Sequence, residues 1–186
     1  MYYPDISSIT AATWRDPVNY PIKLNVRNSG HSGNENAGLY PWVGSWGFSQ
    51  YFPAIEGVYY FYNGASGKNS ISQDVGVPGD CWSDIDLGLC KVSVGFGFRY
   101  ERNINGVGSF VEFLDSNGNE LSNSDSVLVR ETDQTVKDSW EIYDFYIVSN
   151  NHNIPAGTRS VRISIVSDII SGTVYVDTIT AAVERR

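Results

Sequence analysis

The sequence predicts an all-β fold, a sandwich of short antiparallel strands, from one pattern and one feature of composition. Residues 91–101 alternate strictly, and their large apolar side chains share one face: Val92, Val94, Phe96, Phe98 and Tyr100. Aromatic residues make up 13% of the chain and 18 residues are glycine, which suits strands joined by tight turns. A period of two is typical of a strand with one buried face.

Further strands follow from the same reasoning. An aromatic strand at 58–62, a turn at Gly64 and Gly67, and a strand at 69–75 predict a hairpin. Strands at 107–114 and 126–130 flank Asn117-Gly118, which predicts a tight turn with two positive φ angles. Near the C-terminus, residues 161–165 alternate, and residues 172–179 form the final strand.

The length of 186 residues predicts one domain, and we place the sandwich at residues 26–186. Residues 1–25 differ because three prolines interrupt them and their aromatic residues follow no period. We therefore predict an extended N-terminal arm. Its aromatic side chains must pack on the sandwich, on another protein, or on symmetry copies of the chain.

Charge excludes several partners. The formal net charge is −8, and the 13 basic residues are scattered, so we expect no nucleic-acid partner. No apolar run approaches the ~20 residues that span a bilayer, so we expect no membrane insertion. The first residues do not form a secretory signal, which favours export within a larger object such as a virus particle over removal of a signal.

We find no catalytic pattern and expect no enzyme. His31 and His152 lie in loops rich in Gly or Asn, where we expect them to be exposed, and no phosphate-binding loop is present. The 21 acidic residues single out no carboxylate pair of the glycosidase kind. Cys81 and Cys90 are separated by eight residues, and they form either a disulfide or two reduced, partly buried thiols.

Aromatic side chains are the candidate ligand-binding groups, because exposed rings stack on sugars while polar groups bind the hydroxyls. The candidates are Trp42, Trp46 and Tyr51 in a segment rich in Gly and Pro, and Trp82 between the cysteines. We expect Trp46 to belong to the core, and Trp42 or Trp82 to be exposed.

The order of several motifs resembles the galactose-binding-like jelly rolls, which include many carbohydrate-binding modules. The resemblance rests on Trp140 at the head of a strand, on the Pro155-Ala156-Gly157-Thr158-Arg159 turn and the strand after it, and on the last strand with Asp177. An earlier strand with Ser70-Ile71-Ser72-Gln73 and Pro78 also matches. The resemblance implies a jelly-roll β-sandwich.

Relatives of this jelly roll often hold a structural calcium ion between an early carboxylate and an Asp of the last strand. Asp177 matches the second position. Glu35 is the nearest candidate for the first, although its surroundings depart from the family's Asn-x-x-Phe-Glu pattern. The resemblance thus implies a Ca²⁺ site at Asp177 and Glu35.

The leading functional hypothesis is a non-catalytic module that binds a glycan or serves in adhesion, displayed outside the cell or on a virion surface such as that of a phage. One alternative is a virion structural protein, such as a capsid decoration, fibre or tail component, acting through protein contacts. A second is a polysaccharide-active enzyme.

Overall fold

The computed structural model describes residues 19–27, 41–49, 60–124, 127–129, 141–147 and 154–186. Its strands are β1 (Ile22–Lys23), β2 (Val43–Gly44), β3 (Gly47–Ser49), β4 (Tyr60–Asn63), β5 (Gly67–Gly76), β6 (Cys90–Leu114), β7 (Glu120–Asn123), β8 (Val127–Val129), β9 (Glu141–Ile147) and β10 (Ser160–Arg185). A 3-10 turn, η4 (Gly79–Cys81), leads into the short helix α1 (Trp82–Asp86). The prediction of an all-β fold is confirmed.

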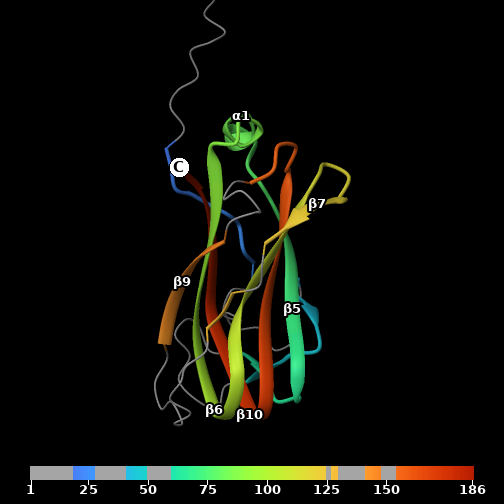
Figure 1. Ribbon diagram of the computed structural model, residues 1–186, viewed down its shortest axis with the longest axis vertical. Coiled ribbons are helices and arrows are strands. Elements are labelled where there is room, and N and C mark those ends of the chain that lie inside the picture. The colour runs from blue at the N-terminus through green and yellow to red at the C-terminus, as the bar shows by residue number, and fades with distance from the viewer. Residues whose placement is uncertain (1–18, 28–40, 50–59, 125–126, 130–140, 148–153) are drawn as a thin grey trace, which may run out of the picture.

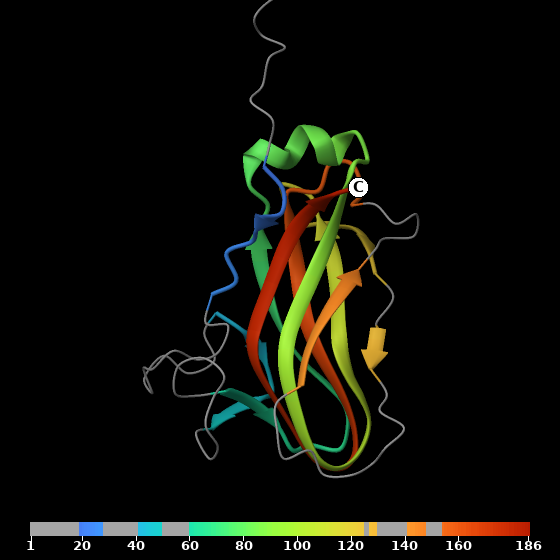
Figure 2. The ribbon, with the colours of Figure 1, turned by 90° about the vertical axis from the view of Figure 1, so that its left-hand side faces the viewer.

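Two long strands, β6 and β10, form the frame of the molecule (Figure 1). They pair antiparallel from one end to the other, with Cys90 opposite Arg185 and Leu114 opposite Ser160. Both strands turn back at the same end of the molecule, the lower end in Figure 2, so that each contributes to both layers of a sandwich. The strands that we expected at 91–101 and 107–114 are therefore two halves of one element, as are those at 161–165 and 172–179.

The two layers are named here after one strand of each. The β5 layer contains β2, β5, residues 160–169 of β10, residues 104–114 of β6, β7 and β8. The β4 layer contains β1, β3, β4, residues 173–185 of β10, residues 90–101 of β6 and β9. All of these pairings are antiparallel.

The bend between the layers depends on Gly172. This residue lies opposite Arg102, and both have positive φ angles, of 124° and 66°. A Cβ atom at Gly172 would overlap the carbonyl oxygen of Glu101 and lie 2.9 Å from the Cβ of Arg102. Only glycine combines this backbone angle with such a close approach of two chains.

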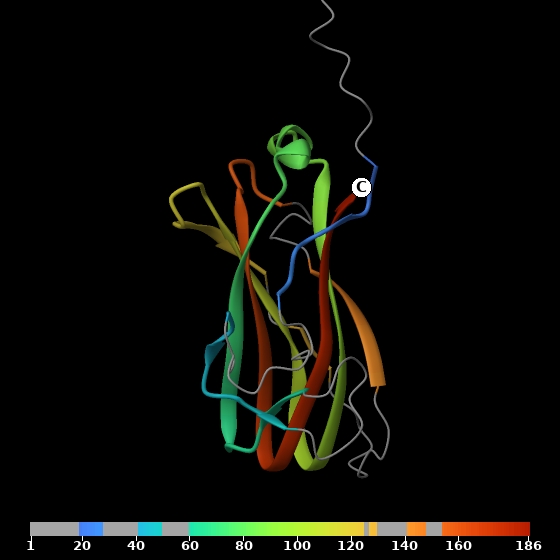
Figure 3. The same cartoon turned by 180° about the vertical axis from the view of Figure 1, so that it is seen from behind.

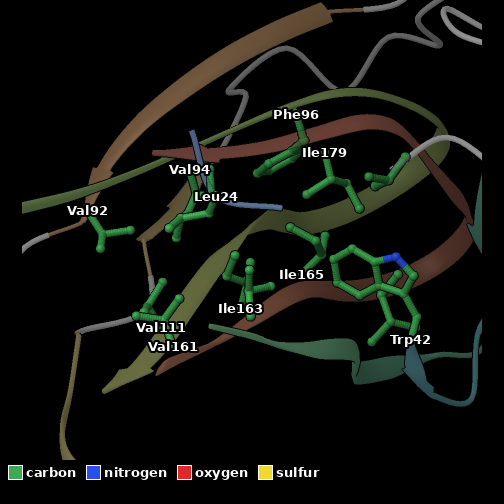
Figure 4. Close-up of a cluster of buried hydrophobic side chains, with 14 of the residues drawn as sticks. Leu24, Trp42, Val92, Val94, Phe96, Val111, Val161, Ile163, Ile165 and Ile179 are labelled. Carbon is green, nitrogen blue, oxygen red and sulfur yellow. The ribbon is translucent and has the colours of Figure 1, made fainter. Parts of the chain in front are cut away.

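The core lies between the layers and uses the alternating side chains of both (Figure 4). Val92, Val94 and Phe96 face it from the β4 layer, while Ile163 and Ile165 face it from the β5 layer. All of them are at most 1% exposed. The face predicted for residues 91–101 is confirmed as a core face.

The described end of the N-terminal segment packs on the sandwich. Ile22 and Lys23 pair with Val183 and Ala182 of β10, and the Leu24 amide donates to the Ala181 carbonyl. Figure 3 shows this segment running beside the C-terminal strand. The arm expected at 1–25 therefore ends in a short strand of the sandwich.

Helix α1 closes the end of the molecule opposite the bends. Tyr20 ties the N-terminal segment to it: its hydroxyl donates to Asp84 Oδ2 at 3.0 Å and lies 3.4 Å from Cys90 Sγ. Cys81 and Cys90 are buried free thiols, so the structure has the reduced alternative. Burial raises the pKa of Cys81 to about 11 and also raises the pKa of Cys90, so both thiols stay protonated at neutral pH. No helix in the described ranges is long and apolar enough to cross a membrane.

The predicted hairpin between residues 58–62 and 69–75 is wrong in its pairing. Both strands form within the described part of these ranges, but β4 pairs with residues 174–176 of β10 and β5 pairs with residues 160–169. The two strands lie in different layers because β10 turns back between these two stretches. The turn after Asn63 thus links the layers.

The predicted turn at Asn117-Gly118 forms, with a different geometry. Among residues 115–119 only Gly118 has a positive φ, 82°, which suits a longer hairpin loop with glycine in the left-handed position. The Asp115 carboxylate accepts bonds from the Asn119 side chain and from the backbone amides of Asn119 and Asn117, and these bonds lower its pKa. The strand after the turn is β7, ahead of the predicted 126–130, where β8 lies.

The bend gives a test of the frame. We expect Gly172→Ala to lower the free energy of unfolding by about 2–4 kcal/mol, because a Cβ strains the backbone and forces two chains apart. Gly76→Ala is the control, since a Cβ there meets no atom within 4 Å, and it should stay within about 1 kcal/mol of the wild type. Urea unfolding measures both, and equal midpoints for the two variants would contradict the role of Gly172.

Candidate functional site

A groove lies on the outer face of the β5 layer. Its volume is about 750 Å³, and it is lined by Pro41, Val43, Ser70, Ser72, Gln73, Asp74, Phe110, Glu112, Arg162, Ser164 and Val166. These residues come from β2, β5, β6 and β10, and Pro41 lies two residues before β2. Gln73 shares the buried face of β5 and is 4% exposed, whereas the other lining residues of β5, β6 and β10 alternate with side chains that fill the core.

The strand register arranges the groove in rows across three strands. In one row Asp74, Arg162 and Glu112 stand directly opposite one another. In the next row Ser72, Ser164 and Phe110 do so. Because outward side chains recur every second residue, the groove changes along the strands from a charged end to a more apolar one with Phe110 and Val166.

The charged row is a fixed hydrogen-bonding group. Arg162 donates through Nε to Asp74 Oδ1 at 2.7 Å and through Nη2 to Asp74 Oδ2 at 3.0 Å. Its Nη1 lies 3.6 Å from Glu112 Oε1. The bonds to Asp74 raise the pKa of Arg162, and Glu112 and Glu120 add to the rise. Two carboxylates thus flank one guanidinium, so the row carries excess negative charge.

A second, smaller hollow lies at the α1 end of the molecule. It measures about 390 Å³ and is lined by Gly79, Trp82, Ser83, Asp86, Leu87 and Arg159. Trp82 is 41% exposed, and its indole N–H donates to the Val77 carbonyl at 2.9 Å. The Arg159 guanidinium carbon lies 4.8 Å from the ring centre of Trp82, a cation–π contact.

Asp86 fixes Arg159 in this hollow. Its two oxygens accept from Arg159 at 3.0 and 2.8 Å, and Oδ1 also accepts from the Gly157 amide. These bonds lower the pKa of Asp86 and raise the pKa of Arg159. Helix α1 and the turn before β10 are thereby joined, which fixes the position of Trp82 against the end of the β5 layer.

The structure separates the predicted tryptophans. Trp46 is 3% exposed, which confirms the expected core position. Trp42 is 4% exposed, donates to the Arg27 carbonyl at 3.1 Å, and packs edge-on against Phe61 with ring centres 5.7 Å apart. Its ring therefore packs at the side of the core (Figure 4). We expected either Trp42 or Trp82 to be exposed, and the exposed residue is Trp82. Tyr51 lies outside the described residues.

Of the two residues expected to bind calcium, the structure describes one. Glu35 lies outside the described residues. Asp177 is fully buried in a register shift of β10, and its Oδ1 accepts from the Thr178 amide at 2.7 Å. Among the described residues no group of three His, Cys, Asp or Glu side chains could hold a metal ion. Calcium binding therefore stays a prediction.

The groove residues were not singled out from the sequence. The alternation did place Arg162 and Ser164 on the outward face of their strand. Their neighbours Asp74 and Glu112 come from other strands, however, and the pairing that joins them depends on register. A search for an outward Arg with acidic residues on candidate neighbouring strands is the signal that would have suggested the row.

Comparison with known proteins finds relatives by structure alone. No family model matches the sequence, and no curated protein matches it significantly. The enzymatically active domain of tailspike protein 4 of bacteriophage CBA120 aligns with a TM-score of 0.58 and 14% identity over 86% of this chain, which corresponds to 21% of the tailspike chain.

Two further structures match over nearly their whole length. TmCBM61, solved with β-1,4-galactotriose, has a TM-score of 0.51 and 22% identity, covering 87% of this chain and 97% of its own. The Stig cyclase Fisc from Fischerella sp. TAU has a TM-score of 0.55 and 13% identity, covering 89% of this chain and 98% of its own.

Carbohydrate-binding modules recur among the matching structures, including modules of two xylanases. The class is therefore defined by fold: the chain is a β-sandwich, a fold that it shares with carbohydrate-binding modules. At these identities the likeness concerns the fold, and the same fold also carries a cyclase.

The tryptophans give a test of the assignment of core and surface. We expect Trp42→Ala to lower the free energy of unfolding by about 3–5 kcal/mol, because it empties a packed site. Trp82→Ala should cost about 1 kcal/mol, since it removes one hydrogen bond and one exposed cation–π contact. Denaturant unfolding of both variants is the measurement. A larger loss for Trp82→Ala than for Trp42→Ala would reverse the assignment.

Proposed function

We propose that this protein is a non-catalytic carbohydrate-binding module, and that it binds its glycan in the groove of the β5 layer. The observation that carries the proposal is the composition of that groove. One stretch offers Phe110 and Val166, with Val43 at the edge, as apolar surface for the C–H face of a sugar ring. The adjacent row offers Asp74, Arg162 and Glu112 as partners for hydroxyl groups.

The shape of the groove supports this function. A volume of about 750 Å³ falls within the range of ~300–1,000 Å³ that is usual for small-ligand sites. The floor consists of paired strands, so it is rigid before any ligand arrives. A preformed site loses less conformational entropy on binding than a mobile one.

Its electrostatics favour a neutral glycan. Arg162 is the cation of the row, and its Nε and Nη2 are engaged by Asp74 while Nη1 faces Glu112. An anionic sugar would meet the excess of carboxylates and would have to displace Asp74. The overall charge of −8 acts in the same direction.

The non-catalytic part of the proposal rests on the placement of the acids. A glycosidase needs an acid and a second carboxylate facing one another across the sugar. In the groove Arg162 stands between Asp74 and Glu112 in the same row and contacts both. The row is suited to holding hydroxyl groups in place.

The binding proposal is tested with two neutral ligands from structures of the same fold, β-1,4-galactotriose and xylohexaose. Titration calorimetry should detect binding of at least one. Phe110→Ala should weaken it at least tenfold, which corresponds to about 1.4 kcal/mol of lost stacking.

The control for this test is Tyr62→Ala. Tyr62 is also an aromatic residue of a strand, 38% exposed, but it lies on β4 in the other layer, so its removal should leave the affinity unchanged. Failure to bind either sugar, or equal affinities for Phe110→Ala and the wild type, would count against the groove as the binding site.

A second candidate function is a structural role in a virion, and the tailspike match favours it because it covers 86% of this chain. Here the protein would act on a virion surface through protein contacts, with the N-terminal arm docking on a neighbouring copy. The two functions are compatible on a particle that attaches to a glycan. An extracellular or virion-surface location suits both.

The structural role predicts an assembly that depends on the arm. Light scattering should then give a mass of several chains, which falls to one chain when residues 1–18 are removed. The truncation stops there because Tyr20 and Ile22 belong to the sandwich. A single-chain mass for both proteins would favour an autonomous binding module instead.

A further inference from the structure

We infer that the groove of the β5 layer and the Trp82 hollow are two parts of one extended site, which binds a glycan chain of several sugars along β10. This inference rests on the proposed function, since it extends the groove's ligand from a short sugar to a polymer segment. It joins the one exposed tryptophan among the described residues to the groove.

The ladder of strands leads from one site to the other. Beyond the row of Asp74 and Arg162, the next outward pair is Gly76 and Ser160. The pairing then continues for one more residue, because the Val77 amide donates to the Arg159 carbonyl at 2.9 Å. Val77 in turn accepts the indole N–H of Trp82. Trp82 is thus held directly at the end of the strand whose earlier residues line the groove.

The ladder residues between the two sites are small. Gly76 has no side chain and is exposed, and a Cβ placed there would meet no atom within 4 Å. Its partner in the pair is the small residue Ser160. Leu114, on the far side of Ser160, is buried and lines neither hollow. A chain leaving the charged row therefore crosses Gly76 without meeting a bulky side chain of β5.

The dimensions fit a polymer segment. From Val166 in the groove to Arg159 in the hollow there are seven steps along β10, which at the rise of a strand amount to about 24 Å. This is several times the size of one sugar ring. The apolar groups lie at the two ends, Phe110 and Val166 in the groove and Trp82 in the hollow, with hydrogen-bonding groups between them.

Arg159 and Asp86 give the far end a defined shape. The ion pair holds the guanidinium against one part of the Trp82 ring, and the ring remains 41% exposed. Fixed aromatic and polar groups of this kind offer stacking and hydrogen bonding at small entropic cost. Leu87, 69% exposed, lines the same hollow.

The test uses β-1,4-linked galactan and xylan oligosaccharides of graded length, titrated into the full chain by calorimetry. The wild-type affinity should rise with length beyond the shortest oligosaccharide that binds. Trp82→Ala should bind short oligosaccharides like the wild type and long ones about tenfold more weakly. The ratio of the two affinities should therefore grow with ligand length.

A second variant obstructs the step without touching either end. Gly76→Tyr places a ring over the passage and should also remove the gain with length, whereas Gly76→Ala should retain it. Both changes are tolerated by the backbone, because Gly76 is exposed and is not among the positive-φ glycines. Thermal unfolding of each variant confirms that it is folded.

The outcomes separate the two proposals. The extended site is overturned if the wild-type affinity does not rise beyond the shortest oligosaccharide that binds. It is also overturned if Trp82→Ala and Gly76→Tyr bind long oligosaccharides as tightly as the wild type does. Either result leaves the groove as the binding site. Absence of binding at every length of both series overturns the proposed function together with its extension.

Discussion

The antiparallel pairing of β6 with β10 is the constraint on which the rest of this structure depends. The described strands β1, β4, β5, β7, β8 and β9 each pair with one of these two, so their positions follow from this central pair. The pair turns from one layer into the other at a single place, where Gly172 approaches Glu101. A residue with a side chain there would separate the two strands at the point where the sandwich closes. The fold therefore combines a long regular ladder with one local position that admits only glycine.

The same ladder also creates the site. Inward residues of β5, β6 and β10 fill the core, and their outward neighbours become the rows of the groove, so that stability and recognition use alternate residues of the same strands. Arg162 shows this division. It lies between Val161 and Ile163, both fully buried, while its own side chain is 38% exposed and is held by Asp74. A change of one residue in register would exchange these faces and remove both core and groove.

This dependence on register explains what the sequence could and could not predict. Alternation identified the core face of residues 91–101 and the outward face that carries Arg162, because both are local properties. The partner Asp74 is 88 residues away, and only the tertiary pairing joins the two. The same limit applies to the hairpin expected from residues 58–62 and 69–75, whose strands form but pair with β10 in different layers. Glycine and proline around Trp42 suggested a loop, yet burial depends on what packs against the ring, here Phe61.

The fold alone leaves function open, since matching structures include sugar-binding modules, a tailspike domain and a cyclase. The choice between them rests on how the polar groups of the groove are held. A catalytic group must change its protonation or bonding during a reaction, whereas a recognition group is most effective when it stays in place. Arg162 is paired twice with Asp74 and faces Glu112, and Arg159 is paired twice with Asp86. Both arginines are thus fixed by carboxylates: Arg159 contacts the Trp82 ring, and Arg162 lines the same groove as Phe110. Under the proposed function, two such fixed groups along one ladder suit the recognition of a repeating ligand.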